Sequence, residues 1–254
     1  MERVKTRYFD IANCTYGQLL EEMDFWRLDG RHHYACFCDA NGLAYSWQDA
    51  SLRAAYRAAD AVLADGGVTK VLAWVYGGHL PERVIGPYLF PKAMAYGVAK
   101  GWRHFFYGAG AGTAEVLAGK MREQYPGVQI VGTLSPPFGT ATAEQEADFR
   151  RQIEAAKPDI LWVALGCPKQ EKWAHDQVGK INVPMILPVG AVFDFYSGRI
   201  PHAPDWVHTL GLRWFWRLLT GGRRTVKRTV WCVPRAAGVL LAEFWRIRVL
   251  RERV

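Results

Sequence analysis

A glycine-rich segment in the middle of the chain has the residue types that bind phosphate. It reads Gly108-Ala-Gly110-Ala-Gly112-Thr113 and follows an apolar run that ends at Tyr107. Glycines let backbone N–H groups approach a phosphate, and a helix beginning after them adds the positive end of its dipole. The segment departs from the dinucleotide fingerprint, because Thr113 stands where the third glycine belongs. It predicts a site for a nucleotide or sugar-nucleotide phosphate, with a tight turn that binds no ligand as the alternative.

The segment after the next apolar run argues against a nicotinamide cofactor. The run covers residues 128–131 and is followed by Gly132 and Thr133. A dinucleotide site usually has an acidic residue near this point to bind the ribose. Neither residue is acidic, so hydride transfer is disfavoured. A Rossmann-type oxidoreductase stays as an alternative function.

Two aspartates follow short apolar runs and are candidates for chemistry on a hydroxyl group. Asp65 begins Asp65-Gly-Gly directly after residues 61–64, and Asp194 ends the segment Gly190-Ala-Val-Phe-Asp194. A carboxylate at the end of a strand can act as a general base, and one in a binding cleft can hold sugar or ribose hydroxyls. The alternatives are structural: a turn chosen for its glycines at Asp65, and a carboxylate that caps a turn at Asp194.

A third segment supplies a cation and an amide. Lys169 and Gln170 follow Gly166-Cys-Pro, which comes after the apolar run 160–164. We expect both residues at the start of a helix that faces the ligand. The alternative is a helix cap with solvated charges.

Alternating short apolar runs and amphipathic stretches must position these residues. We predict strands over residues 34–38, 61–64, 104–107, 128–131, 160–164 and 185–188. We predict helices over residues 16–26, 49–58, 82–99, 113–125, 143–156 and 169–178. This alternation is typical of an α/β fold with a largely parallel sheet, in which ligands bind beyond the carboxyl ends of the strands. The rhythm is regular from about residue 101, as in a Rossmann-like half, and a smaller N-terminal lobe precedes it.

Cysteine usage and the chain's beginning indicate the compartment. The five cysteines do not form a disulfide framework, so reduced thiols in the cytosol are expected. Residues 1–10 are charged and contain no apolar signal core, so export is not expected. Cys36 and Cys38 beside His32 and His33 do not match a usual zinc spacing. We therefore predict no metal site and no cofactor.

The positive charge is concentrated at one end of the chain. The chain has 32 basic and 24 acidic residues, a net charge of +8, and residues 205–254 account for all of that excess. The same segment holds five of the eleven tryptophans. This distribution predicts a neutral body over residues 1–204 and a basic, aromatic, helical appendage over residues 205–254.

Arginine mixed with tryptophan in short helices suits the interface of an anionic membrane, where each basic residue contributes about 1 kcal/mol. The predicted membrane-binding residues are Arg213, Trp214, Arg217, Arg223, Arg224, Lys227 and Arg228. One alternative is a helix that packs its aromatic residues on the body. Another is a nucleic-acid-binding module, which the neutral body and the lack of a recognition motif disfavour. No partner nucleic acid is expected.

Several ordered motifs together resemble the WecG/TagA/CpsF glycosyltransferase family over about residues 35–225. They are Ala59-Asp-Ala-Val-Leu-Ala-Asp65-Gly66, Leu80-Pro-Glu82-Arg83-Val-Ile-Gly86, Phe106-Tyr-Gly108-Ala-Gly110, Pro158-Asp159 through Glu171, and Val189-Gly190 through Arg199 followed by Ala203-Pro204. The resemblance implies an inverting, metal-independent transfer of a sugar from a nucleotide donor to a lipid-diphosphate-linked sugar. The donor would be a UDP-sugar of the N-acetylmannosamine or glucose type. The enzyme would be peripheral, on the cytoplasmic face of the plasma membrane, in synthesis of a polysaccharide or cell-envelope glycan.

The resemblance also implies residue roles. Asp65 matches the general base, while Asn41, Arg83 and Gln170 match polar residues of the active site. Contacts to the nucleotide sugar would come from Gly108, Gly110, Lys169, Gly190 and Asp194.

Three positions depart from the family pattern. Asp39 stands where many members have threonine, which makes it a second candidate for the base. Tyr88 replaces a usual aspartate, and His202 replaces the arginine before Ala203-Pro204. Each of these residues is expected to touch the donor or the acceptor, so the identities of the donor sugar and of the acceptor sugar stay open. The sequence also leaves open whether the enzyme assembles into a homo-oligomer.

Overall fold

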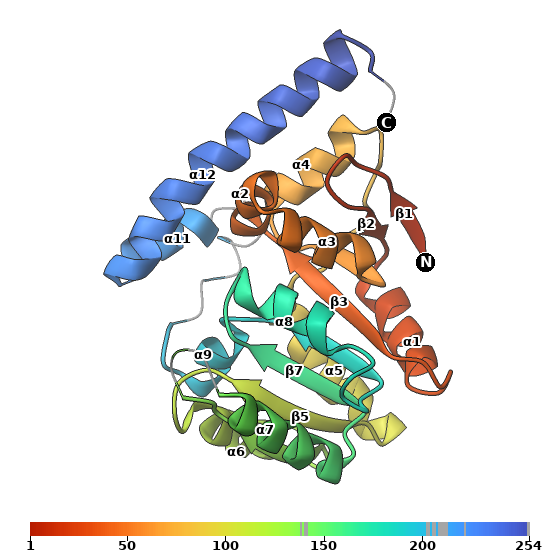
Figure 1. Cartoon of the computed structure of the whole chain (residues 1–254), viewed down its shortest axis with the longest axis vertical. Helices are drawn as coiled ribbons and strands as arrows, with labels where there is room; N and C mark the ends of the chain where they lie inside the picture. The colour runs from red at the N-terminus through yellow and green to blue at the C-terminus, as the bar shows by residue number, and fades with distance from the viewer. Residues whose placement is uncertain are drawn as a thin grey trace. The chain divides into compact units, whose positions relative to one another are not determined.

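The computed structural model describes residues 1–137, 139, 142–201, 204, 207, 213–220 and 222–252 (Figure 1). Contacts group the chain into two compact units. Unit 1 comprises Met1–Thr15, Phe37–Ile85 and Pro201–Val254, and unit 2 comprises Tyr16–Cys36 and Gly86–Ile200. The basic segment that begins at residue 205 is thus grouped with the beginning of the chain.

Six of the described strands form one sheet, which confirms the predicted α/β class. Their order is β4 (Ala61–Ala64), β3 (His33–Cys38), β8 (Met185–Pro188), β7 (Ile160–Ala164), β5 (Arg103–Gly108) and β6 (Gln129–Leu134). The pairs β3–β8, β8–β7, β7–β5 and β5–β6 are parallel. Each strand lies within a few residues of its predicted position. In the register of unit 2, Gly108 lies opposite Ala164, and Val163 lies opposite Pro188. The loops after β5, β7 and β8 therefore leave the sheet at the same edge.

Unit 2 is built around aromatic residues between the sheet and its helices. The helices are α1 (Tyr16–Trp26), α5 (Gly86–Lys100), α6 (Thr113–Gln124), α7 (Ala143–Ala156), α8 (Lys169–Gln177) and α9 (Val192–Ser197). The fully buried Phe90 ring lies 5.0 Å from Trp162 and 5.6 Å from Phe106. These contacts fix α5 on the strands that precede two of the candidate loops.

A buried histidine lies in the same core. The indole N–H of Trp162 donates a hydrogen bond of 3.1 Å to Nδ1 of His104. Burial lowers the pKa of His104 to about 3, because the charged imidazolium would lose its hydration. His104 is therefore neutral at physiological pH, with its proton on Nε2.

Unit 1 combines short helices with the two ends of the chain. It contains β1 (Glu2–Val4) and β2 (Ile11–Asn13), which pair antiparallel, and the helices α2 (Ala40–Gln48), α3 (Ala50–Ala58), α4 (Gly67–Val75), α11 (Arg213–Thr220) and α12 (Arg223–Phe244). A π-helical turn, η1 (Trp245–Val249), follows α12. The long helix α12 packs along α2 and α4 (Figure 1). No helix in the described ranges is long and apolar enough to span a membrane.

The helix predicted from residue 82 begins later, at Gly86. In a helix that began at Glu82, the Pro87 ring would clash with the carbonyl group of Arg83. Pro87 instead occupies the first turn of α5, where its missing N–H has no cost. Glu82 and Arg83 consequently lie in a loop.

Candidate active site

The end of β3 presents Asp39 and Asn41 through the first turn of α2. One Asp39 carboxylate oxygen accepts hydrogen bonds from the backbone N–H groups of Asn41 at 2.8 Å and Gly42 at 3.1 Å. Its other oxygen accepts from the Asn41 side-chain amide at 2.8 Å. Asp39 is thus the N-cap of α2, and the cap fixes the orientation of the Asn41 side chain.

Asp65 follows β4 directly and is tied to the end of β3. Its backbone N–H donates to the carbonyl oxygen of Cys38 at 3.1 Å, and the Thr69 hydroxyl donates to the same oxygen at 2.6 Å. A β-carbon on Gly66 would come within 3.2 Å of the Asp39 Cα. The half-buried Asp65 therefore lies next to the Asp39 turn.

Arg83 completes this group within unit 1. It belongs to the loop before α5, and its Nη1 lies 4.0 Å from the position of a β-carbon on Gly67, the first residue of α4. Four of the five predicted catalytic residues therefore gather in unit 1. They are Asp39, Asn41, Asp65 and Arg83.

The glycine-rich loop of unit 2 has the backbone that its sequence predicts. Gly108 has φ of 113°, and a β-carbon there would come within 2.6 Å of the Ala164 carbonyl oxygen, so no other residue fits. Gly112 caps α6 in the left-handed conformation. The loop thus ends at a helix N-terminus, the arrangement that favours anions.

Arg199, for which the sequence predicts no role, lies over this loop. Its Nη1 donates to the Thr113 hydroxyl at 2.6 Å, and its Nε lies 3.9 Å from an Asp194 carboxylate oxygen. A β-carbon on Gly110 would come within 2.4 Å of the same Nη1. Burial raises the pKa of Asp194 against the opposing effect of Arg199. Gly110, Thr113 and Asp194 are thus linked through one guanidinium group, and short sequence motifs could not indicate such a link.

Gln170 joins the loops that follow β7 and β8. Its buried side-chain oxygen accepts from the Gly166 N–H at 3.0 Å, and its amide donates to Glu171 at 2.9 Å and to the Pro188 carbonyl at 3.3 Å. A β-carbon on Gly190 would lie 3.2 Å from the same oxygen. Gln170 therefore sets the spacing of two loops within unit 2.

Two further predicted site residues, Lys169 and Tyr88, also belong to unit 2. Lys169 extends to the Gly139 carbonyl at 3.0 Å, and Tyr88 is half-buried in the first turn of α5. His202 and Ala203 lie outside the described residues. Among the residues that the structure describes, no three His, Cys, Asp or Glu side chains gather as a metal site requires.

The predicted membrane-binding residues fall on α11 and the start of α12. Arg223 and Lys227 are exposed and one turn apart, and Arg228 is half-buried. Phe215 and Leu219 on α11 are exposed as well, at 48% and 66%. The side chains of Arg213, Trp214, Arg217 and Arg224 lie outside the described part of the structure.

Comparison with known proteins supplies the class of enzyme. The model of the glycosyl transferase WecG/TagA/CpsF family matches residues 4–249. Two curated relatives are named N-acetylglucosaminyldiphosphoundecaprenol N-acetyl-beta-D-mannosaminyltransferase. The protein from Bacillus subtilis is 29% identical over 182 residues, which are 72% of this chain and 68% of the relative. The protein from Bacillus spizizenii is 28% identical over 177 residues, 70% of this chain and 67% of the relative.

The match spans nearly the whole chain, including both groups of candidate residues and the basic helices. The predicted resemblance is therefore confirmed, and the chain is a glycosyl transferase. The chain belongs to the WecG/TagA/CpsF family of glycosyl transferases.

Proposed function

We propose that this enzyme transfers a sugar from a UDP-sugar to a lipid-diphosphate-linked N-acetylglucosamine, with inversion at the anomeric carbon. The acceptor follows the names of the two relatives, which also favour N-acetylmannosamine as the transferred sugar. A glucose-type donor is the second candidate. The observation that carries the proposal is the position of Asp65. Its carboxylate follows the end of β4, and its backbone N–H donates to the carbonyl oxygen of Cys38, next to the turn that presents Asp39.

The donor diphosphate would bind the loop of unit 2 from Gly108 to Thr113. Backbone N–H groups at the start of α6 and the guanidinium of Arg199 offer positive charge to the phosphates. Asp194, which lies beside Arg199, would accept hydrogen bonds from hydroxyl groups of the ribose or the sugar. Lys169, Gly190 and Tyr88 would line the rest of the donor's path.

Asp65 would act as the general base. As the acceptor hydroxyl oxygen forms a bond to the anomeric carbon, the bond from that carbon to the UDP oxygen breaks and the hydroxyl proton passes to Asp65. UDP leaves with the electron pair of the broken bond. One displacement of this kind inverts the configuration.

Arg83 would stabilise the charge that develops on the leaving diphosphate. A fixed cation is effective in this role because it is already oriented when the charge appears. We propose that fixed cationic side chains stabilise the leaving diphosphate and that the reaction needs no metal ion. Asp39 and Gln170 would be positioning residues, since the carboxylate of Asp39 orients Asn41 and the amide of Gln170 joins two loops.

The exposed basic residues of α12 would hold the enzyme on the cytoplasmic face of the plasma membrane, near its lipid-linked acceptor. Arg223 and Lys227 can face anionic headgroups together, while the exposed Phe215 and Leu219 of α11 suit the boundary between headgroups and acyl chains.

Calorimetric titration with UDP and with NADH tests the nucleotide class. The proposal predicts saturable binding of UDP and none of NADH. Binding of NADH without UDP would support the oxidoreductase alternative and contradict the proposal.

A further inference from the structure

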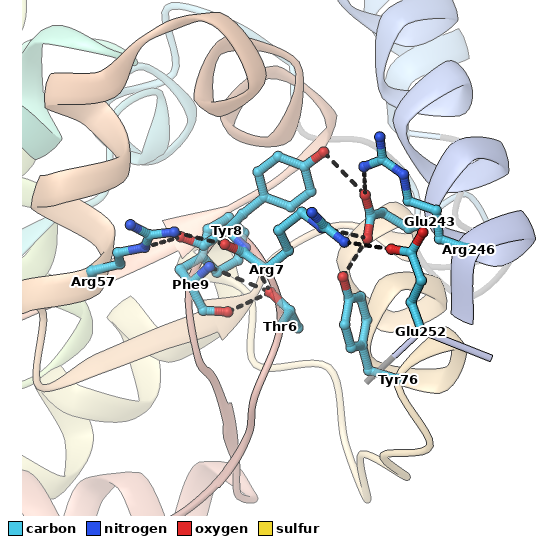
Figure 2. Close-up of polar contacts among 9 residues, drawn as sticks. All are labelled: Thr6, Arg7, Tyr8, Phe9, Arg57, Tyr76, Glu243, Arg246 and Glu252. Carbon is cyan, nitrogen blue, oxygen red and sulfur yellow. Dashed lines mark hydrogen bonds and ion pairs between the residues drawn. The ribbon is translucent and has the colours of Figure 1, made fainter. Parts of the chain in front are cut away.

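A buried carboxylate at the end of α12 binds three parts of unit 1 together (Figure 2). The Glu243 side chain is fully buried. One of its oxygens accepts from the Arg246 guanidinium at 3.1 Å and from the Tyr8 hydroxyl at 3.4 Å. The other accepts from the Tyr76 hydroxyl and lies 3.5 Å from Arg7 Nε. The N-terminal segment, the end of α4 and α12 thus meet at one side chain.

The N-terminal part of this cluster is itself fixed. Arg57 on α3 donates to the backbone carbonyl groups of Arg7 at 2.7 Å and Tyr8 at 3.0 Å. The Thr6 hydroxyl donates to the Phe9 carbonyl at 2.6 Å and closes the turn that carries Arg7 and Tyr8. Glu243 therefore contacts a segment that hydrogen bonds tie to α3 and to its own turn (Figure 2).

Most of the fully buried side chains of α12 are small and apolar. Cys232, Ala236 and Val239 form a buried stripe at helical spacing, and Glu243 continues it by one turn. Small apolar side chains make contacts that are neither large nor directional. Hydrogen bonds to a carboxylate depend on both distance and angle. The cluster around Glu243 thus helps to fix how far along α2 and α4 the helix lies and which way it is rotated. The Phe244 ring, stacked 6.2 Å from that of Trp74, supports the same end of the helix.

The other end of this stripe lies against the turn that carries the candidate catalytic residues. The rings of Trp231 on α12 and Tyr45 on α2 are 5.0 Å apart. Cys232 is near enough to Asp39 for that carboxylate to contribute to raising the thiol's pKa, behind the larger effect of burial. Cys232 and Glu243 are eleven positions apart, about 16 Å along a helix. A shift of α12 at Glu243 would therefore be transmitted to its contact with the Asp39 turn.

We infer that Glu243 is a positioning residue of the transferase: by holding α12 on the N-terminal segment and α4, it places the middle of α12, at Trp231 and Cys232, against α2 and the turn that presents Asp39 and Asn41. The inferred effect of Glu243 on catalysis rests on the proposed function. The inferred effect of Glu243 on the position of α12 does not depend on that function.

Hydrogen exchange measured by mass spectrometry tests the structural part. Glu243→Ala should accelerate exchange across α12 by about tenfold or more, because several donors lose a charged partner. Glu252→Gln is the matched control, since Glu252 makes an exposed ion pair with Arg7 at 3.0 Å, and α12 should exchange there as in the unaltered protein. If Glu243→Ala does not fold, Tyr76→Phe removes a single donor and should accelerate exchange in α12 by about fivefold. Unchanged α12 exchange in the folded variants would overturn the inference.

Steady-state kinetics test the catalytic part. Glu243→Ala should raise the KM for the lipid-linked acceptor by about tenfold and leave the KM for the UDP-sugar unchanged, because the donor loops belong to unit 2. Glu243→Gln keeps one acceptor oxygen, so its KM for the lipid-linked acceptor should lie between that of Glu243→Ala and that of the unaltered enzyme. A merely structural role would reduce the active fraction, lowering kcat with both KM values unchanged, and that result would overturn the positioning role. Failure of the unaltered enzyme to transfer any sugar would count against the proposed function, whereas the exchange experiment would still decide the helix contact.

Discussion

The backbone of Gly66 lies against that of Asp39, so that a β-carbon on Gly66 would come within 3.2 Å of the Asp39 Cα. The loops after β3 and β4 are therefore in direct contact within unit 1. Because the two aspartates are neighbours, proximity to the candidate site does not decide which of them is the general base. The Asp39 side chain has a structural role, because it caps α2.

Asp65→Asn should reduce kcat by about 10²- to 10⁴-fold, the usual effect of losing a general base. UDP affinity should remain within about twofold, since the amide keeps the shape of the carboxylate. Turnover assays and UDP titration measure the two effects. Asp176→Asn, which changes an exposed carboxylate on α8, is the control.

Asp39 provides the contrasting variants. Asp39→Ser keeps a side-chain oxygen that can cap α2, whereas Asp39→Ala loses the cap and should destabilise the fold by about 1 kcal/mol. We expect Asp39→Ser to retain most of the activity. If it is as inactive as Asp65→Asn, the base is Asp39 or is shared by both residues.

Gly110→Ala should weaken UDP binding by roughly tenfold, about the effect of losing one charge-assisted hydrogen bond. The new methyl group would come within 2.4 Å of Arg199 Nη1 and displace that side chain from the loop. Gly119→Ala is the control, because a β-carbon at Gly119 meets nothing within 4 Å. Equal UDP affinity in the two variants would show that Arg199 and this loop do not bind the donor.

Replacing Arg223 and Lys227 together with alanine should lower partition onto vesicles rich in phosphatidylglycerol by about 30-fold, at about 1 kcal/mol for each charge. Both side chains are exposed. Sedimentation with vesicles measures the change. The double variant of Arg151 and Lys180, which removes the same charge from exposed positions of unit 2, should bind as the unaltered protein does. An equal loss in both variants would indicate attraction by net charge alone.

The buried His104 should make the fold less stable in acid. The pKa of His104 is about 3 in the folded chain, below its ordinary value of 6.5. Between these values the unfolded chain binds a proton that the folded chain does not, so the free energy of unfolding falls as pH falls. The expected loss at pH 5 is about 2 kcal/mol.

Urea unfolding at pH 7.5 and pH 5 measures this loss. His104→Gln keeps an oxygen acceptor for the Trp162 indole and should show a correspondingly smaller difference between the two pH values. His79→Gln, which changes an exposed histidine, should unfold as the unaltered protein does. The same pH dependence in His104→Gln would show that other groups cause it.

The strands of the sheet could be predicted because buried strands are short apolar runs between turn residues. The helices α2 and α4 could not. α2 contains Asn41 and Gly42, and α4 begins with Gly67, Val68 and Thr69, which are all residues of modest or low helix propensity. Packing against α12 stabilises both helices, and such a long-range contact leaves no local pattern.

In the candidate site, too, local features could be predicted from the sequence and long-range contacts could not. Glycines and carboxylates after predicted strands indicated the Asp65 and Gly108 loops, because the carboxyl ends of parallel strands meet at one edge. The contact of Arg199 with Thr113 joins residues 86 positions apart, and that of Tyr8 with Glu243 joins residues 235 apart. Only the folded chain brings such pairs together.

The proposed reaction can be tested by transfer from a panel of UDP-sugars to a synthetic lipid-diphosphate N-acetylglucosamine, with product detected by mass spectrometry in the presence and absence of EDTA. We expect transfer from one donor, of the N-acetylmannosamine or glucose type, at a rate that EDTA does not change. Loss of activity with EDTA would contradict the metal-independent mechanism. Absence of transfer from every donor, together with absence of UDP binding, would contradict the proposed function itself.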